Sequence, residues 1–147
     1  MQGKKRKVVQ AILYELVGMA FVSPMIAYAF DETLAYSGTL AALLSLSAMS
    51  WNILFNALFE RWEARQVERS RTLRRRLLHA AGFEGGLAIL LVPLMAWWLH
   101  ISFVEAFVAD LGLLLFFLIY AFVFQWGFDR VFGVPDSAKE QSSLCVE

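Results

Sequence analysis

Four long apolar blocks limit this chain to one class of fold. They cover approximately residues 8–30, 34–59, 77–99 and 104–128. Each block reaches the roughly 20 residues that a helix needs to cross the hydrocarbon core of a membrane. Because lipid offers no hydrogen-bonding partner to backbone groups, each block must be helical. The sequence therefore predicts an all-α integral membrane protein with four transmembrane helices.

The first apolar block does not have the pattern of a removable leader. Residues 8–30 exceed the roughly 7–15 apolar residues of a signal peptide. We therefore expect this block to be retained as a helix. We expect residues 1–147 to form a single membrane domain in which 134–147 are a flexible cytoplasmic tail.

Positive charge is confined to certain segments and predicts the orientation in the membrane. The 13 Lys and Arg residues occur at 4–7, at 61–76 and at positions 130 and 139, and the short turns near Asp31 and His100 contain none. Because cytoplasmic segments carry an excess of Lys and Arg, both termini and the 60–76 segment are predicted to be cytoplasmic. We interpret the basic 61–76 segment as this orienting charge on a solvated helix extension, not as a nucleic-acid site.

The chain also repeats itself at a constant offset in residue number (84 − 15 = 69). Helices that run out, in, out and in give both hairpins the same orientation, so we predict a tandem parallel repeat of two-helix hairpins. The units cover about 4–62 and 73–131. The matched pairs are Arg6/Arg75, Ala11/Ala80, Glu15/Glu84, Pro24/Pro93, Phe55/Phe124, Phe59/Phe128 and Arg61/Arg130.

Each repeat unit carries one carboxylate inside an otherwise apolar helix, namely Glu15 and Glu84. An ionisable side chain inside a membrane is costly and by default indicates a functional site. At 1.5 Å per residue, both lie about 12 Å below the cytoplasmic boundary. The second and fourth helices bring aromatic and amide side chains to the same depth. The predicted substrate-binding residues are Glu15, Tyr14, Trp51, Asn52, Asn56, Phe83, Glu84 and Tyr120.

The two carboxylates suit an exchange of protons for cations. A low dielectric favours the neutral form of a carboxyl group, which then holds a proton until a cation arrives. Aromatic faces attract organic cations. We therefore predict that protons and lipophilic cations compete for Glu15 and Glu84, which is the minimal chemistry of proton-coupled cation export.

Other polar residues near the site have two interpretations each. Glu60 and Asp129, at the cytoplasmic mouth, either attract cations or offset neighbouring Arg side chains. His79 is either a proton relay or a hydrogen-bonding partner for a neighbouring helix. Asn52 could line the pocket or hold helices together. We interpret Asp110, like Glu105, as part of a solvated turn, with a gate as the alternative.

Three glycines and the absence of enzyme motifs complete the interpretation. Gly82, Gly85 and Gly86 give the third helix a face that a neighbour can approach closely.

The sequence has no HExxH, no nucleophile elbow and no phosphate-binding glycine loop. We expect no enzyme, no metal, no cofactor and no nucleic acid. The single Cys145 is expected to be a reduced thiol in the tail.

Two other classes of function remain as alternatives. An accessory membrane subunit could pair its buried acids with basic residues of a partner, and a cation channel could use the same acids without exchange. The pairing of an acid with aromatic side chains in both halves favours a transporter. Since four helices enclose little room, we expect a homodimer, with a monomer that has a lateral cleft as the alternative.

The motifs that carry these residues resemble the proteobacterial antimicrobial compound efflux family. They read R-x-x-H-A-x-x-F-E at Arg76–Glu84, W-N-x-x-F-N-x-x-F-E at Trp51–Glu60 and Y-x-F-x-F-Q-W-x-F-D at Tyr120–Asp129. The resemblance covers about residues 4–130. It implies four transmembrane helices, a location in the bacterial inner membrane, and proton-driven export of chlorhexidine, cationic dyes such as acriflavine, and short diamines.

The resemblance also implies roles for individual positions. The family's essential membrane carboxylate falls on Glu15. In the first motif this chain has Gln10 where the family usually has His, so half of any histidine relay is missing. The other motif positions fall on Arg6 or Lys7, Trp51, Asn52, Asn56, Glu60, His79, Glu84, Tyr120, Trp126 and Asp129.

Overall fold

The computed structural model describes residues 3–66 and 73–133. In these ranges the chain forms α-helices and no strand. The helices are α1 (Gly3–Phe30), α2 (Leu34–Ala64), α3 (Leu73–Leu99) and α4 (Phe103–Phe132). All four are long and apolar enough to cross a membrane, which confirms the predicted fold class. The predicted tail 134–147, with Cys145, lies outside the described residues.

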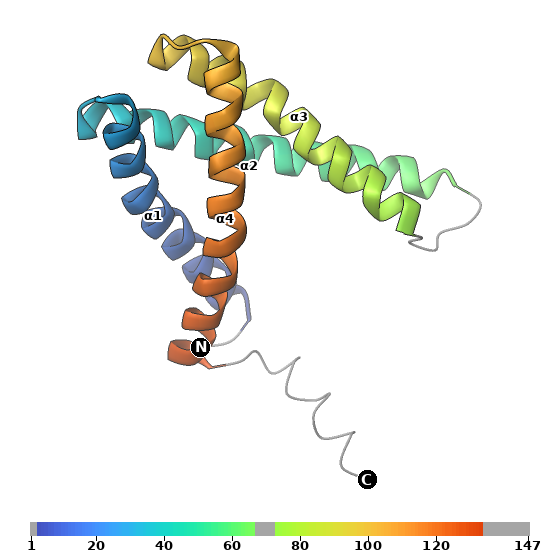
Figure 1. Cartoon of the computed structure of the whole chain (residues 1–147). Helices are drawn as coiled ribbons and strands as arrows, with labels where there is room; N and C mark the ends of the chain where they lie inside the picture. The colour runs from blue at the N-terminus through green and yellow to red at the C-terminus, as the bar shows by residue number, and fades with distance from the viewer. Residues whose placement is uncertain (1–2, 67–72, 134–147) are drawn as a thin grey trace.

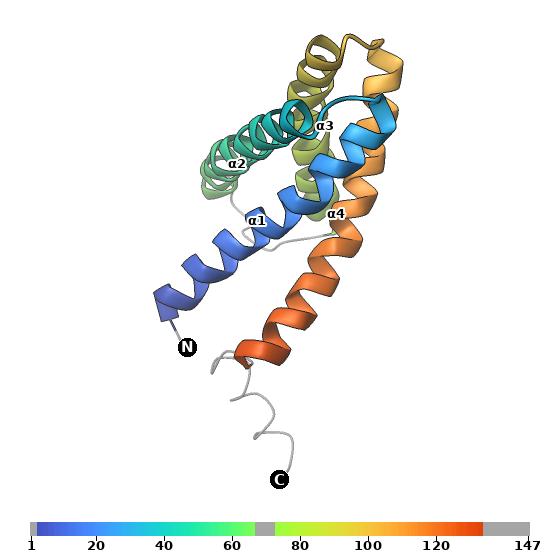
Figure 2. The same cartoon turned by 90° about the vertical axis from the view of Figure 1, so that its left-hand side faces the viewer.

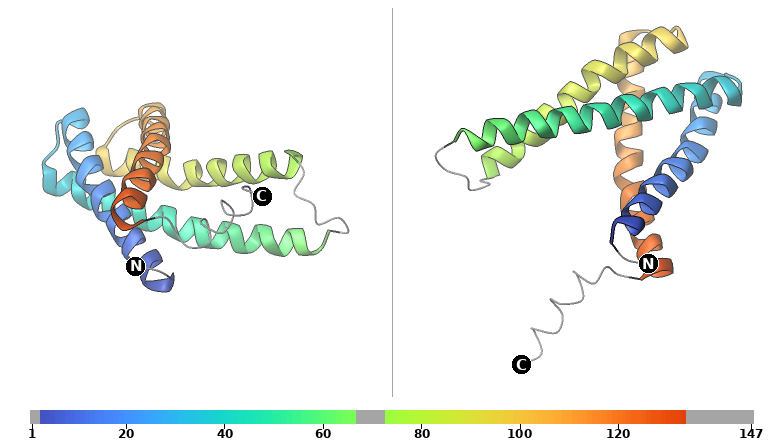
Figure 3. Two further views of the ribbon diagram at one scale, coloured as in Figure 1. Left: turned by 90° about the horizontal axis from the view of Figure 1, so that it is seen from below. Right: turned by 180° about the vertical axis from the view of Figure 1, so that it is seen from behind.

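The helices form two arms that diverge from one corner (Figure 1). The short turns between α1 and α2 and between α3 and α4 both lie at this corner. From it, α1 and α4 extend together as a first arm, and α2 and α3 extend together as a second arm (Figures 2 and 3). Each arm therefore combines one helix from each half of the chain.

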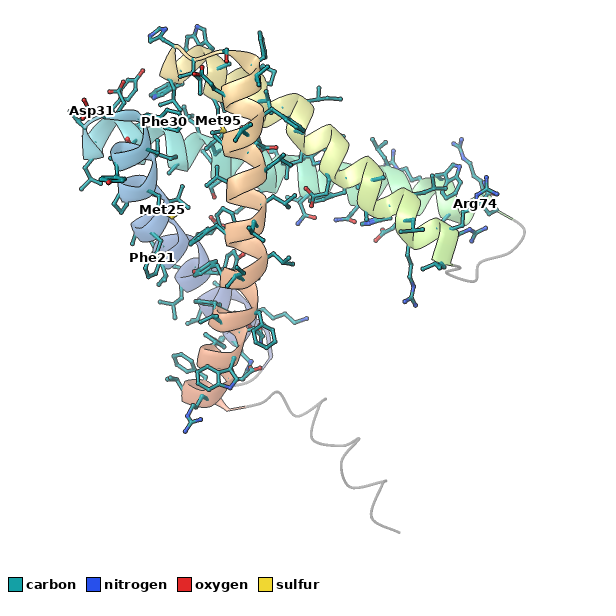
Figure 4. All side chains as sticks on the ribbon, viewed as in Figure 1. Phe21, Met25, Phe30, Asp31, Arg74 and Met95 are labelled. Atoms are coloured by element: carbon teal, nitrogen blue, oxygen red, sulfur yellow. The ribbon has the colours of Figure 1, made fainter. Side chains whose placement is uncertain are left out.

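The buried apolar core lies at the corner. Leu40 and Met95 are fully buried there, and Figure 4 shows Met95 where the arms meet. Away from the corner, many large apolar side chains face outward, as expected of helices surrounded by lipid. The core residues are Val22, Ile26, Leu40, Ala41, Leu44, Leu91, Val92, Met95, Ala96, Leu99 and Ala106.

The two turns at the corner have the same local construction. Asp31 and His100 are equivalent under the sequence offset (100 − 31 = 69), and both adopt a left-handed backbone with φ of 54°. Shortly after them, Thr33 and Ser102 cap α2 and α4 by accepting a backbone N–H with the hydroxyl oxygen. Ser102 also forms a capping box with Glu105. The left-handed residue ends one helix, and the cap begins the next.

Within the arms, positions related by the same offset make matching hydrogen bonds. In the first arm, the Tyr120 hydroxyl donates to the carbonyl oxygen of Tyr14 at 2.7 Å. In the second, Nε1 of Trp51 donates to the carbonyl oxygen of Phe83 at 2.9 Å. The offsets are 120 − 51 = 69 and 83 − 14 = 69. Hence α4 contacts α1 through the same sequence positions that bring α2 against α3.

A second pair of bonds follows the same relation. Nε2 of Gln10 donates to Oε1 of Gln125 at 2.6 Å, between α1 and α4. His79 and Asn56 pair at 3.0 Å between α3 and α2, and the offsets 79 − 10 and 125 − 56 are again 69. The amide that replaces the motif histidine at position 10 thus keeps a bond to the neighbouring helix.

Candidate functional site

A cavity of about 470 Å³ lies between the two arms and is lined by side chains of all four helices. Its wall is mostly apolar, but three carboxylates line it. They are Glu15 of α1, Glu84 of α3 and Asp110 of α4. A largely apolar cavity with a few converging polar groups is typical of a small-molecule site.

Glu15 and Glu84, predicted from the sequence as the two central acids, line the same cavity. Both side chains are half-buried. The Ser45 hydroxyl of α2 donates to Oε2 of Glu15 and so ties this carboxylate to α2. The position equivalent to Ser45 in the second half is Leu114 (114 − 45 = 69), which lines the cavity but has no hydroxyl to donate. The two acids therefore occupy equivalent positions with different neighbours.

Asp110 corrects our interpretation of the segment after the third helix. Because Ser102 caps α4, the helix begins at Phe103 and Asp110 lies well inside it, not in a solvated turn. Its side chain is half-buried and lines the cavity. Glu105, by contrast, is exposed at the cap, as expected. The sequence did hold a signal, since Asp110 is an acid within the apolar block 104–128.

The predicted substrate-binding residues fall into two groups. Tyr14, Asn52 and Phe83 line the cavity together with the two glutamates. Trp51, Tyr120 and Asn56 are not among its lining residues. Trp51 and Tyr120 instead hydrogen-bond the backbone of the neighbouring helix in their arm.

Trp51 and the glycines of α3 explain how closely the second arm is packed. A Cβ atom added at Gly86 would lie 2.0 Å from Cζ2 of Trp51, and one at Gly82 would lie 3.2 Å from the Phe55 ring. Nothing lies within 4 Å of such an atom at Gly85. The predicted close approach therefore uses Gly82 and Gly86, and the Trp51 ring occupies the space that Gly86 leaves.

A second cavity, of about 460 Å³, lies along the first arm. It is lined by Lys7, Gln10 and Gln125, and it shares Tyr14, Glu15 and Met49 with the main cavity. Glu15 therefore borders both spaces. A carboxylate in this position can be reached from the main cavity and from the side that leads toward the N-terminus.

The residues predicted at the cytoplasmic mouth have different surroundings. Asp129 forms an ion pair with Arg6, which is 5% exposed and also donates to the carbonyl oxygen of Gly133. The Arg6 guanidinium lies over the Phe128 ring, 5.2 Å from its centre. These contacts join the start of α1 to the end of α4. Glu60, in the other arm, is exposed.

His79 lies inside the second arm and not on either cavity wall. Its Nε2 donates to Oδ1 of Asn56, whose amide in turn donates to Oδ1 of Asn52 at 2.6 Å. The rings of Phe55 and Phe59 meet its imidazole edge-on. This geometry suits the interpretation of His79 as a hydrogen-bonding partner between helices. The chain His79–Asn56–Asn52 also reaches the cavity, because Asn52 lines it.

Comparisons with known proteins agree with the resemblance seen in the motifs. A family model described as chlorhexidine efflux transporter matches residues 2–65 and 71–134. The starts of these two segments differ by the same offset as the repeat (71 − 2 = 69). The family and the relatives described next are transporters and not enzymes, as predicted. No solved structure matches the chain.

Three relatives are described as short-chain diamines transporters. The protein of Acinetobacter baylyi is 36% identical over 127 residues, which cover 86% of this chain and 89% of the relative. That of Acinetobacter baumannii is also 36% identical and covers 86% and 88%. That of Vibrio parahaemolyticus is 34% identical over 128 residues and covers 87% and 91%. The chain is therefore a multi-pass membrane transporter and belongs to the chlorhexidine efflux transporter family, also called the proteobacterial antimicrobial compound efflux family.

Proposed function

We propose that this protein is a proton-coupled antiporter that exports organic cations across the bacterial inner membrane. The observation that carries this proposal is the cavity between the arms, which Glu15 and Glu84 both line. The names of the relatives favour short-chain diamines as substrates. Chlorhexidine, after which the family is described, and cationic dyes such as acriflavine are the further substrates that we propose.

In this mechanism the two glutamates hold either protons or the ammonium groups of the substrate. A mostly apolar wall keeps the local dielectric low, so a carboxylate without a cation is costly and gains by taking up a proton. A substrate cation that enters the cavity replaces the proton. Tyr14 and Phe83 supply aromatic surface for the cation beside these acids.

The charge distribution supports loading from the cytoplasm. Lys and Arg residues lie toward the tips of both arms, as Arg74 shows in Figure 4, whereas Asp31 and Glu32 lie at the corner. By the positive-inside rule we place the arm tips and both termini in the cytoplasm. The second cavity would then provide a route from the cytoplasmic side to Glu15.

We propose further that the chain is one domain of two repeat units, about 4–62 and 73–131, that works as a homodimer. The matching hydrogen bonds at equivalent positions support the repeat. The core supports the dimer, since its buried residues gather at the corner and leave the arms with long apolar faces. A second copy could cover part of these faces and enlarge the cavity, and lipid would cover the remainder.

The purified protein in vesicles that contain a pH-sensitive dye tests the proposal. Putrescine, chlorhexidine and acriflavine are added outside, and proton movement is recorded. We expect at least one cation to drive proton movement, and Glu15→Gln to reduce it to the level of protein-free vesicles because the amide cannot exchange a proton.

The matched control is Glu32→Gln, the same change in the turn outside both cavities, which we expect to retain exchange. Undiminished exchange by a well-folded Glu15→Gln protein would contradict the assignment of coupling to Glu15. Proton flux that needs no substrate would indicate a channel, and no flux with any of the three cations would favour an accessory subunit.

A further inference from the structure

The three carboxylates of the main cavity lie at two different distances from the corner, counted in residues along their helices. Along the helices, Glu15 and Glu84 are equally far from the corner ends Phe30 and Leu99 (30 − 15 = 15 and 99 − 84 = 15). Asp110 is nearer to Phe103, the corner end of α4 (110 − 103 = 7). Measured along the helices at 1.5 Å per residue, Asp110 is therefore roughly 12 Å closer to the corner than the two glutamates.

Apolar side chains of α3 and α4 line the cavity that Asp110 shares with the two glutamates. On α4, the side chains that follow Asp110 on the same helix face are Leu113, Leu114 and Phe117, and all three line the cavity. Leu87 and Leu91 of α3 also line it. The cavity wall therefore combines Asp110, a hydrocarbon surface, and the carboxylates of Glu15 and Glu84.

Asp110 has no hydrogen bond and no cationic partner among residues 3–66 and 73–133. The ion pair between Arg6 and Asp129 lies at the far end of the first arm. A half-buried carboxylate without a partner is costly in an apolar cavity. A ligand with a second positive charge would relieve this cost.

We propose that Asp110 binds the distal ammonium group of a linear α,ω-diamine whose other ammonium group is held by Glu84 and Glu15. The methylene chain of the diamine lies along the leucines between them. Asp110 is then a specificity-determining residue, because a monoamine of equal length places a methyl group beside an unpaired carboxylate. This inference rests on the proposed function and assigns to Asp110 the selection of diamines over monoamines in the same cavity.

Binding of two amines of equal size separates this role from a general effect of charge. Putrescine and n-pentylamine each have six non-hydrogen atoms and differ only in one terminal group. Affinities are measured by calorimetry on the purified full chain, and the same pair is tested as drivers of proton movement in vesicles. We expect the wild type to prefer putrescine, and Asp110→Asn to weaken putrescine binding about tenfold or more with little change for n-pentylamine.

Two further variants control the measurement. Asp31→Asn makes the same change at the exposed turn of the corner, outside both cavities, and is expected to keep the wild-type preference. Asp110→Glu keeps the charge and is expected to keep most of the preference for putrescine. If the Asp110→Asn protein fails to fold, the Asp110→Glu protein still tests whether the preference depends on a carboxylate at this position.

The outcomes distinguish this inference from the proposed function. If putrescine and n-pentylamine bind the wild type equally, or if Asp110→Asn weakens the binding of both to the same extent, Asp110 does not bind the second ammonium group. If the preference depends on Asp110 but no amine moves protons, the diamine site stands and the antiport proposal fails. If amines drive proton exchange and the preference survives Asp110→Asn, the antiport proposal stands and this inference fails.

Discussion

At the scale of single residues, the two glutamates of the cavity are equivalent in sequence but differ in surroundings. Glu15 accepts a hydrogen bond from Ser45, and the position equivalent to Ser45 in the second half holds Leu114. Of the two glutamates, Glu15 borders both cavities and Glu84 borders the main cavity alone. A hydroxyl donor stabilises a carboxylate and fixes its direction, so the two halves share the acids but differ in the groups that position them.

The ion pair between Arg6 and Asp129 is expected to hold the tip of the first arm together. Arg6 is buried and bonds both Asp129 and the Gly133 carbonyl, so removal of either charge leaves the other without its partner. We expect Arg6→Gln and Asp129→Asn each to destabilise the protein by about 1–3 kcal/mol and to be strongly non-additive when combined. Unfolding in detergent micelles, followed by circular dichroism, measures the coupling.

Substitution of Arg130 is the control for the Arg6 and Asp129 variants. Arg130 is exposed and lies over the Trp126 ring, 5.5 Å from the ring centre, so Arg130→Gln is expected to change the free energy of unfolding by no more than about 0.5 kcal/mol. If Arg6→Gln is as mild as Arg130→Gln, or if the two changes at Arg6 and Asp129 simply add, the pair does not stabilise the arm.

Sequence reasoning identified part of the cavity. Depth along a helix could be counted from the sequence, and Glu15, Glu84 and Tyr14, which were selected in part by that count, line the cavity. The same count did not predict which groups the side chains of Trp51 and Tyr120 contact, because depth along a helix does not show which neighbouring helix lies against each of its faces. Their long side chains turn to the backbone of the partner helix in each arm.

At the scale of the helices, apolar blocks predicted where each element lies in lipid but not where it ends. The helix α2 continues to Ala64 and α4 to Phe132, beyond the predicted 59 and 128. Polar and charged residues form much of these extensions, and a helix does not need lipid to continue, since its backbone bonds are internal. The starts at the corner agreed closely because Thr33 and Ser102 are helix caps at the beginning of the apolar blocks.

The contact between α2 and α3 depends on the absence of a side chain at Gly86. An alanine there would put its Cβ 2.0 Å from the Trp51 ring, which is held by its bond to the Phe83 carbonyl. We expect Gly86→Ala to displace Trp51, break this bond and lower the melting temperature of the purified protein.

Gly85→Ala is the matched control for this prediction. Its Cβ would meet nothing within 4 Å, and alanine favours a helix over glycine by roughly 0.5–1 kcal/mol, so the melting temperature should stay equal or rise. A drop of equal size in both variants would show that helix α3 itself, not its contact with Trp51, is sensitive. In that case the packing argument would be wrong.

At the scale of the whole molecule, the divergence of the two arms is the feature that hydropathy could not predict. Block length and charge set the number of helices and their order, but crossing angles depend on which side chains interlock. The arms also pair helices from different halves, α1 with α4 and α2 with α3, which the hairpin repeat alone does not imply (Figure 1). The shared core at the corner leaves the arm tips as the parts that can move relative to each other.

Antiport requires that the cavity open alternately to the two sides, and a pivot between the arm tips and the corner turns would achieve this by moving the arms as rigid bodies. Two pairs of exposed, equivalent positions report such motion (77 − 8 = 69 and 97 − 28 = 69). Val8 and Leu77 lie toward the arm tips, and Tyr28 and Trp97 lie near the corner. Cysteines at each pair, with Cys145→Ser as background, carry spin labels for distance measurements in nanodiscs.

With putrescine bound, or with Glu15→Gln and Glu84→Gln combined to imitate two protonated acids, we expect the Val8–Leu77 distances to shorten and the Tyr28–Trp97 distances to lengthen. Opposite changes follow from a pivot between the two pairs, whereas general loosening would lengthen both. Dilution of labelled protein with unlabelled protein removes distances between subunits of a dimer. Distances that stay constant under all conditions would mean that the arms do not move against each other, and the transport cycle would then need another moving element.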